Sequence, residues 1–382
     1  MIYLNFPVGA AHGWGVCGKY VARELSRLAD VRLLTDPFNV ASIGDEIETR
    51  ELGALLPSQA EIARLDVRTP LKLDAPLLQL ANKQLEPMTK NLSGLPTLGY
   101  CFFEDTELRP QHIESGRRHF DRLATGSTWC SEILRRHGIE NVATVLQGVD
   151  TAAFFPRPQA RQFLRDKFVV FSGGKFEFRK GQDLVIRAFK ALADRHADVM
   201  LVASWFNQWP FSFRSMSQSP HIRFAPSSQD ANLATAEVLA QNGVDLNRVI
   251  LIGPRQHHAM AQVYHNSDVG IFPNRAEGGT NLVLMEYMAC GKPVIATAST
   301  GQADVIAPGH ALVIDTAGEV LSSSDGESVA RWPEPNLDQA IERLEWAYQN
   351  RDALTPLADR AASKMAAMPW SRTAEQFLSL LS

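Results

Sequence analysis

The sequence lacks the long apolar runs and the paired cysteines that define several large classes of protein. No apolar run approaches the roughly 18 residues that a membrane span needs. The first residues contain no basic stretch followed by a long apolar one, so we do not expect a secretion signal. The four cysteines are scattered without metal-ligand spacing, and we expect reduced thiols. These absences predict a cytoplasmic protein.

The sequence also lacks a strong excess of either charge. A formal net charge of −4 gives no overall attraction to nucleic acid or to acidic membranes. The short basic clusters at 117–119 and 135–137 leave membrane docking open only as the less favoured option. No Asp-x-Asp motif offers metal ligands, and we expect no metal ion and no nucleic-acid partner.

Strand-like apolar segments alternate with amphipathic helical segments along the chain, which is typical of parallel sheets covered by helices. With 382 residues, two α/β domains are the natural division. A turn-rich passage at 147–156 separates two such series. We therefore predict an N-terminal domain at 1–149, together with a terminal helix at 370–382, and a C-terminal domain at 150–369.

Some segments are harder to place. The first helix is expected at 20–28, and the last at 373–381 after an interruption at Pro369-Trp370. Residues 39–95 stay unassigned in detail. Residues 206–240 are polar and are interpreted as an irregular insertion or lid.

The most informative segment places a Gly-Gly turn between two carboxylates. Glu277 precedes the turn, a short helix is expected to begin at about Asn281, and Glu286 lies inside that helix. Free backbone N–H groups at a helix start suit a phosphate, and two carboxylates beside them suit sugar hydroxyls. The segment therefore predicts a nucleotide-sugar site. Its plainer interpretation is a capped helix with a solvated glutamate at each end.

A second candidate segment, at 172–181, follows an apolar strand and precedes a helix. Its two glycines let the backbone approach a ligand, and Lys175, Arg179 and Lys180 supply positive charge. A departing diphosphate needs such charge, because its negative charge grows as the glycosidic bond breaks. The plainer alternative is a basic surface turn. The acidic segment in the same half of the chain favours a ligand site.

A third candidate is the match Gly13-x-Gly15-x-x-Gly18 near the first strand. Together with Asp36 it outlines the dinucleotide fingerprint, which favours an NAD(P)-dependent oxidoreductase as the alternative function. Gly13 lies seven positions after Phe6, whereas the fingerprint places its first glycine at the end of the strand. A close backbone turn in a binding cleft is the plainer explanation.

Two further groups of residues have a structural role as the plainer alternative. Glu104 and Asp105 follow a strand expected at 98–103, at the kind of strand end where α/β sheets bind ligands. An acidic helix cap is the alternative for them. His257 and His258 lack a third metal ligand nearby, so one packed and one solvated histidine are expected.

Three passages together resemble the retaining glycosyltransferases of family 4, also called glycosyl transferases group 1, which have the GT-B architecture. Residues 277–295 resemble the Glu-x7-Glu motif and its continuation, here Glu286-Tyr-Met-Ala-Cys-Gly-Lys-Pro-Val-Ile295. Residues 174–181 resemble the "GR…KG" turn, and 145–156 resemble the crossing between domains. The resemblance implies two Rossmann-like, doubly wound α/β domains that face a deep interdomain cleft, with the C-terminal helix crossing back to the N-terminal domain.

The resemblance also implies roles for individual residues. Glu286 would bind the ribose hydroxyls and Glu277 the hydroxyls of the donor sugar. Lys180 would bind the diphosphate, and Lys175 stands where the family usually has arginine. Glu104 falls where many members carry a histidine near the reaction centre. The other residues expected to contact the donor are Gly15, Gly174, Arg255, Gly278, Gly279, Thr280 and Asn281. One departure is that eight residues, not seven, separate the two glutamates.

The function implied is that of a hexosyltransferase. It would move a sugar from a nucleotide-diphosphate sugar, such as a UDP-sugar, to a hydroxyl of a carbohydrate or small-molecule acceptor. The anomeric configuration would be retained, without a metal ion or cofactor. The oxidoreductase and a sugar-nucleotide epimerase of the same architecture stay open as alternatives.

Overall fold

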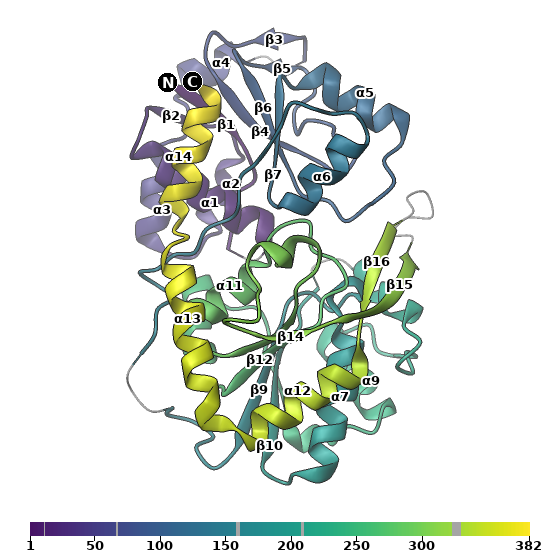
Figure 1. Cartoon of the computed structure of the whole chain (residues 1–382). Helices are drawn as coiled ribbons and strands as arrows, with labels where there is room; N and C mark the ends of the chain where they lie inside the picture. Colours follow the sequence, from purple (N-terminus) through teal and green to yellow (C-terminus); the bar gives the residue numbers. More distant parts are fainter. Residues whose placement is uncertain (11, 66–67, 158–160, 208–209, 323–329) are drawn as a thin grey trace. The chain divides into compact units, whose positions relative to one another are not determined.

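The computed structural model describes residues 1–10, 12–65, 68–157, 161–207, 210–322 and 330–382 (Figure 1). The chain forms two compact units, each built on a six-stranded parallel sheet. The first comprises Met1–Gly148, Gly278–Thr280 and Met368–Ser382, and the second comprises Val149–Glu277 and Asn281–Ala367. The predicted α/β class with two doubly wound, Rossmann-like sheets is confirmed.

The first unit has the strand order β2-β1-β4-β6-β7-β8. These strands are β1 (Ile2–Asn5), β2 (Val31–Leu33), β4 (Leu77–Ala81), β6 (Thr97–Cys101), β7 (Arg122–Thr125) and β8 (Val142–Thr144), with a small separate pair of β3 (Leu71–Lys72) and β5 (Leu92–Ser93). Its helices are α1 (Gly13–Ser26), α2 (Pro37–Ala41), α3 (Glu46–Gly53), α4 (Gln59–Arg64), α5 (Pro110–His119), α6 (Thr128–Arg136) and α14 (Trp370–Leu381).

The second unit has the strand order β11-β10-β9-β12-β13-β14. These strands are β9 (Phe168–Gly173), β10 (Val199–Ser204), β11 (Val249–Leu251), β12 (Val269–Phe272), β13 (Val294–Thr297) and β14 (Leu312–Ile314). Its helices are α7 (Gln182–Arg195), α8 (Pro210–Arg214), α9 (Ala231–Gln241), α10 (Met260–His265), α11 (Leu282–Ala289), α12 (Leu337–Gln349) and α13 (Thr355–Ala366). The chain order reverses between β9 and β12, and such switch points are where α/β sheets bind ligands.

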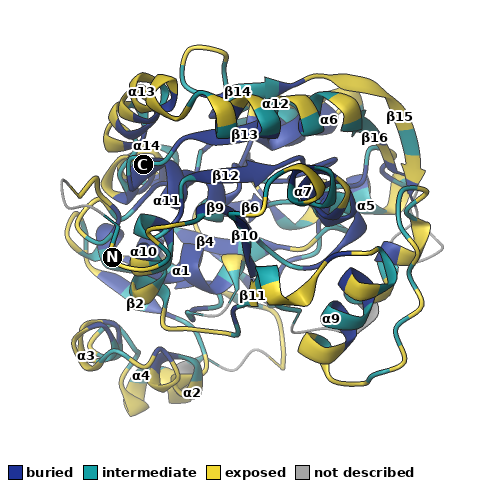
Figure 2. Cartoon of the chain, turned by 90° about the horizontal axis from the view of Figure 1, so that it is seen from below, coloured by how far each residue is buried: buried dark blue, intermediate teal, exposed yellow. Residues whose placement is uncertain are grey.

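The core of the second unit lies between its central strands and the helices that cover them. Every residue of β9, β12 and β13 is buried, as Figure 2 shows, because these strands are covered on both faces. Phe168, Val170 and Leu201 belong to this core together with Phe189 of α7 and Leu344 of α12. The covered sheet provides a rigid base for the loops at its carboxyl edge.

The prediction for the first helix is wrong at its start. Helix α1 begins at Gly13, so the three glycines lie in its first two turns and not in a loop. The helix is capped by His12, whose Nδ1 accepts a hydrogen bond from the Gly15 N–H at 3.0 Å. A Cβ atom on Gly18 would lie 2.0 Å from the carbonyl oxygen of Pro7, so glycine lets the helix pack closely on the loop after β1.

Residues 39–95, which the sequence analysis left unassigned, contain β4, a strand inside the first sheet. Its side chain Gln79 is fully buried and donates to the carbonyl of Leu92 at 3.2 Å. Because this polar residue interrupts a short apolar stretch, hydropathy does not identify the segment as a strand.

The prediction of an irregular segment at 206–240 is wrong where α9 forms. The carboxylate of Asp230 caps this helix by accepting from the N–H groups of Asn232 and Leu233. Leu233 is 61% exposed whereas Leu239 is fully buried, so apolar residues are not confined to one face. That arrangement removes the periodic signal on which a helix prediction depends.

Two elements at the end of the chain also differ from expectation. An antiparallel hairpin of β15 (Thr316–Ser322) and β16 (Ala330–Pro335) was not predicted. Helix α14 begins at Trp370 and not at Thr373. The ring of Trp370 stacks on Tyr20 of α1 with centroids 5.3 Å apart, which joins the last helix to the first within one unit.

Candidate functional site

The lysine turn, residues 174–181, joins the end of β9 to α7. Gly174 and Gly181 have φ angles of +118° and +72°, a left-handed region that favours glycine. A Cβ atom on Gly181 would lie 2.0 Å from the carbonyl oxygen of Pro273, so glycine also permits close approach to the chain after β12. Residues Phe178–Lys180 form a 3₁₀ turn that ends at Gly181. The turn therefore lies at the switch point of the sheet.

The acidic segment leaves the neighbouring strand β12 and leads into α11. The Glu277 N–H donates to the Thr300 hydroxyl at 3.0 Å, and the Glu277 carbonyl accepts from the Gly301 N–H at 2.9 Å. Asn281 caps α11 with φ +66°, and its side-chain oxygen accepts from the Leu284 N–H. Asparagine is one of the few residues other than glycine that adopts this left-handed conformation readily.

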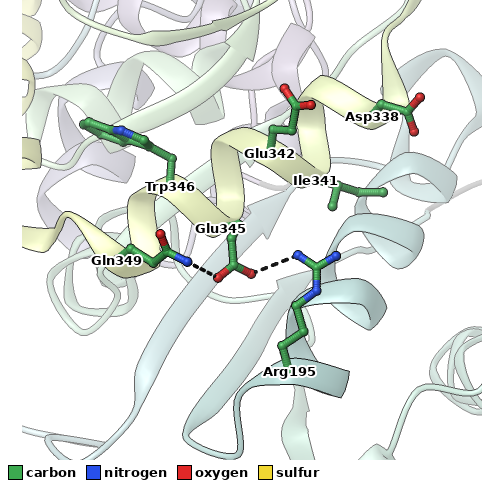
Figure 3. Close-up of a pocket in the computed structure, with 7 residues that line it drawn as sticks. All are labelled: Arg195, Asp338, Ile341, Glu342, Glu345, Trp346 and Gln349. Atoms are coloured by element: carbon green, nitrogen blue, oxygen red, sulfur yellow. Dashed lines mark hydrogen bonds and ion pairs between the residues drawn. The ribbon is translucent and has the colours of Figure 1, made fainter.

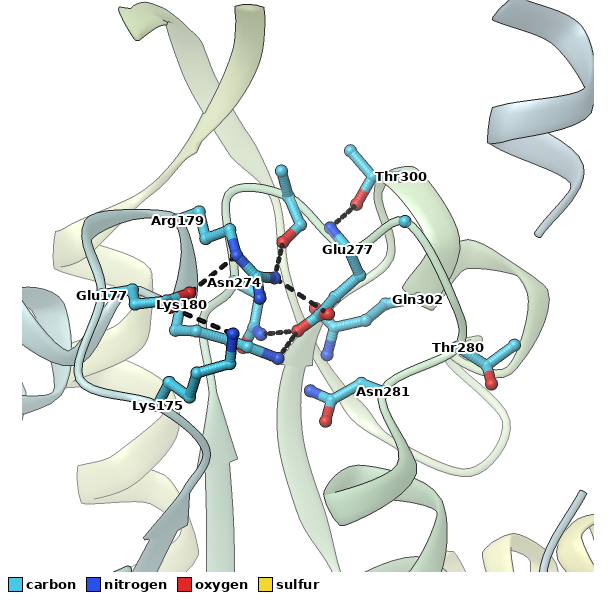
Figure 4. Close-up of polar contacts among 12 residues, drawn as sticks. Lys175, Glu177, Arg179, Lys180, Asn274, Glu277, Thr280, Asn281, Thr300 and Gln302 are labelled. Atoms are coloured by element: carbon cyan, nitrogen blue, oxygen red, sulfur yellow. Dashed lines mark hydrogen bonds and ion pairs between the residues drawn. The ribbon is translucent and has the colours of Figure 1, made fainter. Parts of the chain in front are cut away.

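The two segments meet at the carboxylate of Glu277, which is buried (Figure 4). Lys180 Nζ lies 2.5 Å from Glu277 Oε1, and Arg179 Nη1 donates to Oε2 at 3.3 Å. The Asn274 amide also donates to Oε1. Burial lowers the pKa of Lys180, and the carboxylate of Glu277 opposes this shift. The acidic and basic groups singled out in the sequence thus lie side by side.

A second carboxylate balances the remaining cations of the lysine turn. Lys175 Nζ lies 3.2 Å from Glu177 Oε1, and Arg179 Nε lies 2.8 Å from Glu177 Oε2. Burial alone would raise the pKa of Glu177, but Arg179 and the neighbouring lysines lower it to about 2. Three cations therefore face two carboxylates, and the local excess of positive charge suits an oxyanion.

Two buried amide nitrogens beside these charges lack a hydrogen-bond partner among the described residues. They are Asn281 Nδ2 and Gln302 Nε2. Figure 4 shows both side chains near the group formed by Glu277 and Lys180. The oxygen of Asn281 caps α11, so its N–H₂ end faces away from that helix start. A buried donor left unpaired costs about 1–3 kcal/mol, and an oxygen of a ligand would remove that cost.

Glu286 lies in α11, where its carboxylate is held by two side chains of another segment. His257 Nε2 lies 2.6 Å from Oε1, and the Tyr264 hydroxyl donates to Oε2 at 3.2 Å. Burial raises the pKa of Tyr264 well above 10, with Glu286 adding to the shift, so the hydroxyl keeps its proton. His257 is the packed histidine that was expected, and the side chain of His258 is 39% exposed.

The other residues predicted for the site lie in two different units. Gly15, Glu104 and the turn residues Gly278, Gly279 and Thr280 belong to the first unit. The Thr280 N–H donates there to the side chain of Gln147 at 3.2 Å. Arg255, in the second unit, follows β11 and is exposed. The contacts made by the carboxylates of Glu177, Glu277 and Glu286 that are described above all lie within the second unit.

Arg275, which was not among the predicted site residues, is the largest fully buried side chain in the described part of the chain. Its guanidinium makes ion pairs with Asp183 of α7 and Glu334 of β16 and lies over the ring of Phe178. Because Arg275 lies two positions before Glu277, its contacts join the acidic segment to the lysine turn, α7 and the hairpin. Arginine is common on protein surfaces, and no local pattern signals that this one is buried.

A separate depression in the second unit is formed by the end of α7 and by α12 (Figure 3). The residues that line it are Arg195, Asp338, Ile341, Glu342, Glu345, Trp346 and Gln349. Arg195 and Gln349 already bind the carboxylate of Glu345, at 3.3 and 2.7 Å. The three lining carboxylates do not suit an anionic ligand, which leaves the carboxyl edge of the sheet as the better candidate.

Neither a metal cluster nor a membrane helix is found in the described ranges. No group of three or more histidine, cysteine, aspartate or glutamate side chains there is arranged to hold a metal ion. Within the same ranges, every helix is too short or too polar to span a bilayer.

Comparison with known proteins defines the class. Residues 157–331 match the family model Glycosyl transferases group 1, a stretch that contains the lysine turn, the acidic segment and Glu286. In solved structures, HepE of Anabaena, crystallised with UDP-glucose, superposes with a TM-score of 0.67 over 100% of this chain and 98% of that chain, at 14% identity. Sucrose-phosphate synthase of Thermosynechococcus elongatus gives 0.66 over 99% and 97%, at 16% identity. These structures show that the fold is GT-B.

The resemblance to glycosyl transferases group 1 is thus confirmed over residues 157–331. The GDP-mannose-dependent alpha-(1-6)-phosphatidylinositol monomannoside mannosyltransferase of Mycolicibacterium smegmatis is 28% identical over 53% of this chain and 50% of its own length. D-inositol 3-phosphate glycosyltransferase 1 of Catenulispora acidiphila is 28% identical over 63% and 51%. The chain thus matches about half the length of these curated relatives.

Proposed function

We propose that the protein transfers a sugar from a nucleotide-diphosphate sugar to an acceptor hydroxyl, with retention of configuration and without a metal ion. The observation that carries the proposal is the contact between Lys180 and Glu277 at the switch point of the second sheet. It combines a cation for a leaving diphosphate with a carboxylate for sugar hydroxyls. The family match over 157–331 and the relatives' names support the same reaction class.

The lysine turn would stabilise the departing diphosphate. Lys175 and Lys180 supply charge, and the start of α11 adds its dipole and the free amide of Asn281. The negative charge on the leaving oxygen grows as the glycosidic bond breaks, so these donors bind the transition state more tightly than the ground state. Donors of this kind can replace the divalent ion that other transferases use.

Glu277 would change partners when the donor binds. In the structure its carboxylate is held by Lys180, Arg179 and Asn274. A bound diphosphate would compete for the ammonium of Lys180, because it offers more negative charge than one carboxylate. The oxygen released from Lys180 could then accept hydrogen bonds from hydroxyls of the donor sugar. Ion pairing in the free protein keeps the carboxylate in place until that exchange.

Glu286 would accept hydrogen bonds from the ribose hydroxyls, and Glu104 and Arg255 are proposed to lie near the acceptor and the nucleobase. One named relative uses GDP-mannose, and one structural neighbour was crystallised with UDP-glucose. The donor is therefore best sought among hexoses linked to UDP or GDP. The acceptor would be a carbohydrate or another small molecule with a free hydroxyl.

A donor screen followed by variants tests the proposal. Thermal unfolding is first measured with UDP-glucose, GDP-mannose and related donors, because a bound donor raises the melting temperature by mass action. With the donor found, Lys180→Met and Glu286→Gln should each lower transfer by on the order of 10²-fold. Lys190→Met is the matched control, since that ammonium pairs with Asp194. Near-normal transfer in both site variants would refute the assignment.

A further inference from the structure

None of the steps proposed above uses the contact between His257 and Glu286. The side chain of His257 is 10% exposed, and its ring packs on Phe154 with centroids 5.2 Å apart. An ionised carboxylate only accepts hydrogen bonds, so the Nε2 atom that faces Glu286 must carry a proton. His257 is therefore a donor to Glu286 whether or not its other nitrogen is protonated.

The second oxygen of Glu286 is held by Tyr264, which is itself fixed by aromatic packing. The Tyr264 ring lies 5.1 Å from Phe171 and 5.5 Å from Tyr287, measured between centroids. His257 and Tyr264 belong to consecutive elements, the 3₁₀ turn His257–Ala259 and α10. Both oxygens of the Glu286 carboxylate are thus bound by side chains of one short segment, residues 257–264.

Two-point contact matters because the last torsion of a glutamate side chain is soft. Its terminal torsion has no sharp staggered minima, so a single hydrogen bond leaves the carboxylate plane free to turn. Two donors on opposite oxygens set that plane. A carboxylate offers about four acceptor sites, so each oxygen of Glu286 can still accept one more hydrogen bond. The geometry suits a ligand that presents two neighbouring hydroxyls.

We propose that His257 is a positioning residue that orients Glu286 for the paired 2′- and 3′-hydroxyls of a ribose. The inference rests on the proposed function, in which Glu286 binds the ribose. Removing the Nε2 donor leaves Tyr264 as the only other donor that the structure shows on this carboxylate within its described ranges. Glu286 would then lose alignment with one of the two hydroxyls, and the protein would lose its preference for ribose.

The test compares a nucleoside diphosphate with its 2′,3′-dideoxy analogue. Calorimetry identifies which of UDP, GDP and ADP binds the wild-type protein best, and the ratio of the two dissociation constants is then measured. His257→Phe keeps the ring packing but removes the donor, and it should lower the ratio by about tenfold. His257→Gln, whose amide nitrogen can donate from a similar position, should restore most of the ratio. His258→Ala is the neighbouring control and should leave it unchanged.

The outcomes separate the inference from the proposed function. A wild-type protein that binds no nucleoside diphosphate, or binds both forms equally, removes the ribose role of Glu286 itself. A wild-type preference that survives within twofold in His257→Phe overturns the positioning role alone. Loss in His257→Phe without rescue by His257→Gln also overturns it, because hydrogen bonding would not be the cause. Unchanged affinity for the dideoxy analogue in each variant shows that the pocket is intact.

Discussion

Replacing Arg275 by methionine should destabilise the second unit by about 3–5 kcal/mol. The side chain is fully buried and uses all five of its N–H groups. Nε and Nη2 donate to Glu334 at 2.6 and 2.7 Å, and Nη1 and Nη2 each donate to Asp183 at 2.8 Å. Nη1 also donates to the carbonyl of Phe178 at 2.7 Å. Burial alone would lower the pKa of Arg275, but Asp183 and Glu334 outweigh it and raise the pKa.

The size of this effect follows from what the substitution leaves behind. Asp183 is fully buried and would keep the Ser219 hydroxyl, 2.6 Å from its Oδ2, but would lose its counter-charge. An uncompensated buried carboxylate is among the most destabilising defects in a protein interior. Glu334 would keep His221, at 3.0 Å, and therefore contributes less to the loss.

Urea unfolding followed by tryptophan fluorescence measures the loss, because Trp332 lies in β16 two residues before Glu334. Arg331→Met, on an exposed position of the same strand, is the control and should stay within about 0.5 kcal/mol of the wild type. Adding Asp183→Leu to Arg275→Met should recover part of the stability, since the unpaired charge is then gone. A loss below about 1 kcal/mol with an unchanged slope would refute the reasoning.

Three further predictions concern stability. Asn281→Ala should lower the free energy of unfolding by about 2 kcal/mol, because φ is +66° and a helix cap is lost, whereas Asn281→Gly should lower it by only about a few tenths of a kcal/mol. Equal urea midpoints for the two variants would contradict this. Gly18→Ala should lower the melting temperature, because its Cβ would lie 2.0 Å from a carbonyl oxygen, whereas Gly53→Ala, with nothing within 4 Å, should raise it. Burial would raise the pKa of Glu177, but Arg179 holds it at about 2, so its stabilisation is lost as pH falls from 4.5 towards 2; Glu177→Gln should flatten that part of the stability curve.

Much of the second unit could be predicted because its strands are short, apolar and separated by amphipathic helices. Helix α11, for example, starts directly after Asn281 as expected. The failures have physical causes. Helix α9 carries apolar residues on its exposed side as well as its buried side, and β4 carries a buried glutamine, so neither shows the periodicity that sequence reasoning uses.

The candidate site was only partly visible in the sequence. Glycines beside charged residues pointed to the lysine turn and the acidic segment, because glycine followed by a helix start is a recognisable local pattern. The donors that orient Glu286 gave no comparable signal. For His257 and His258 the sequence predicts only one packed and one solvated histidine, and the role of Tyr264 depends on a contact between two helices.

Local periodicity and turn chemistry are sufficient to predict the α/β class, the two series of strands and the residue types of the site. Which of those residues meet depends on how the whole chain folds. Lys180 and Glu277 are 97 positions apart, and Arg275 and Asp183 are 92 apart. Their contacts exist because β9 and β12 pair as neighbours at the point where the strand order reverses, and that pairing is a property of the whole sheet.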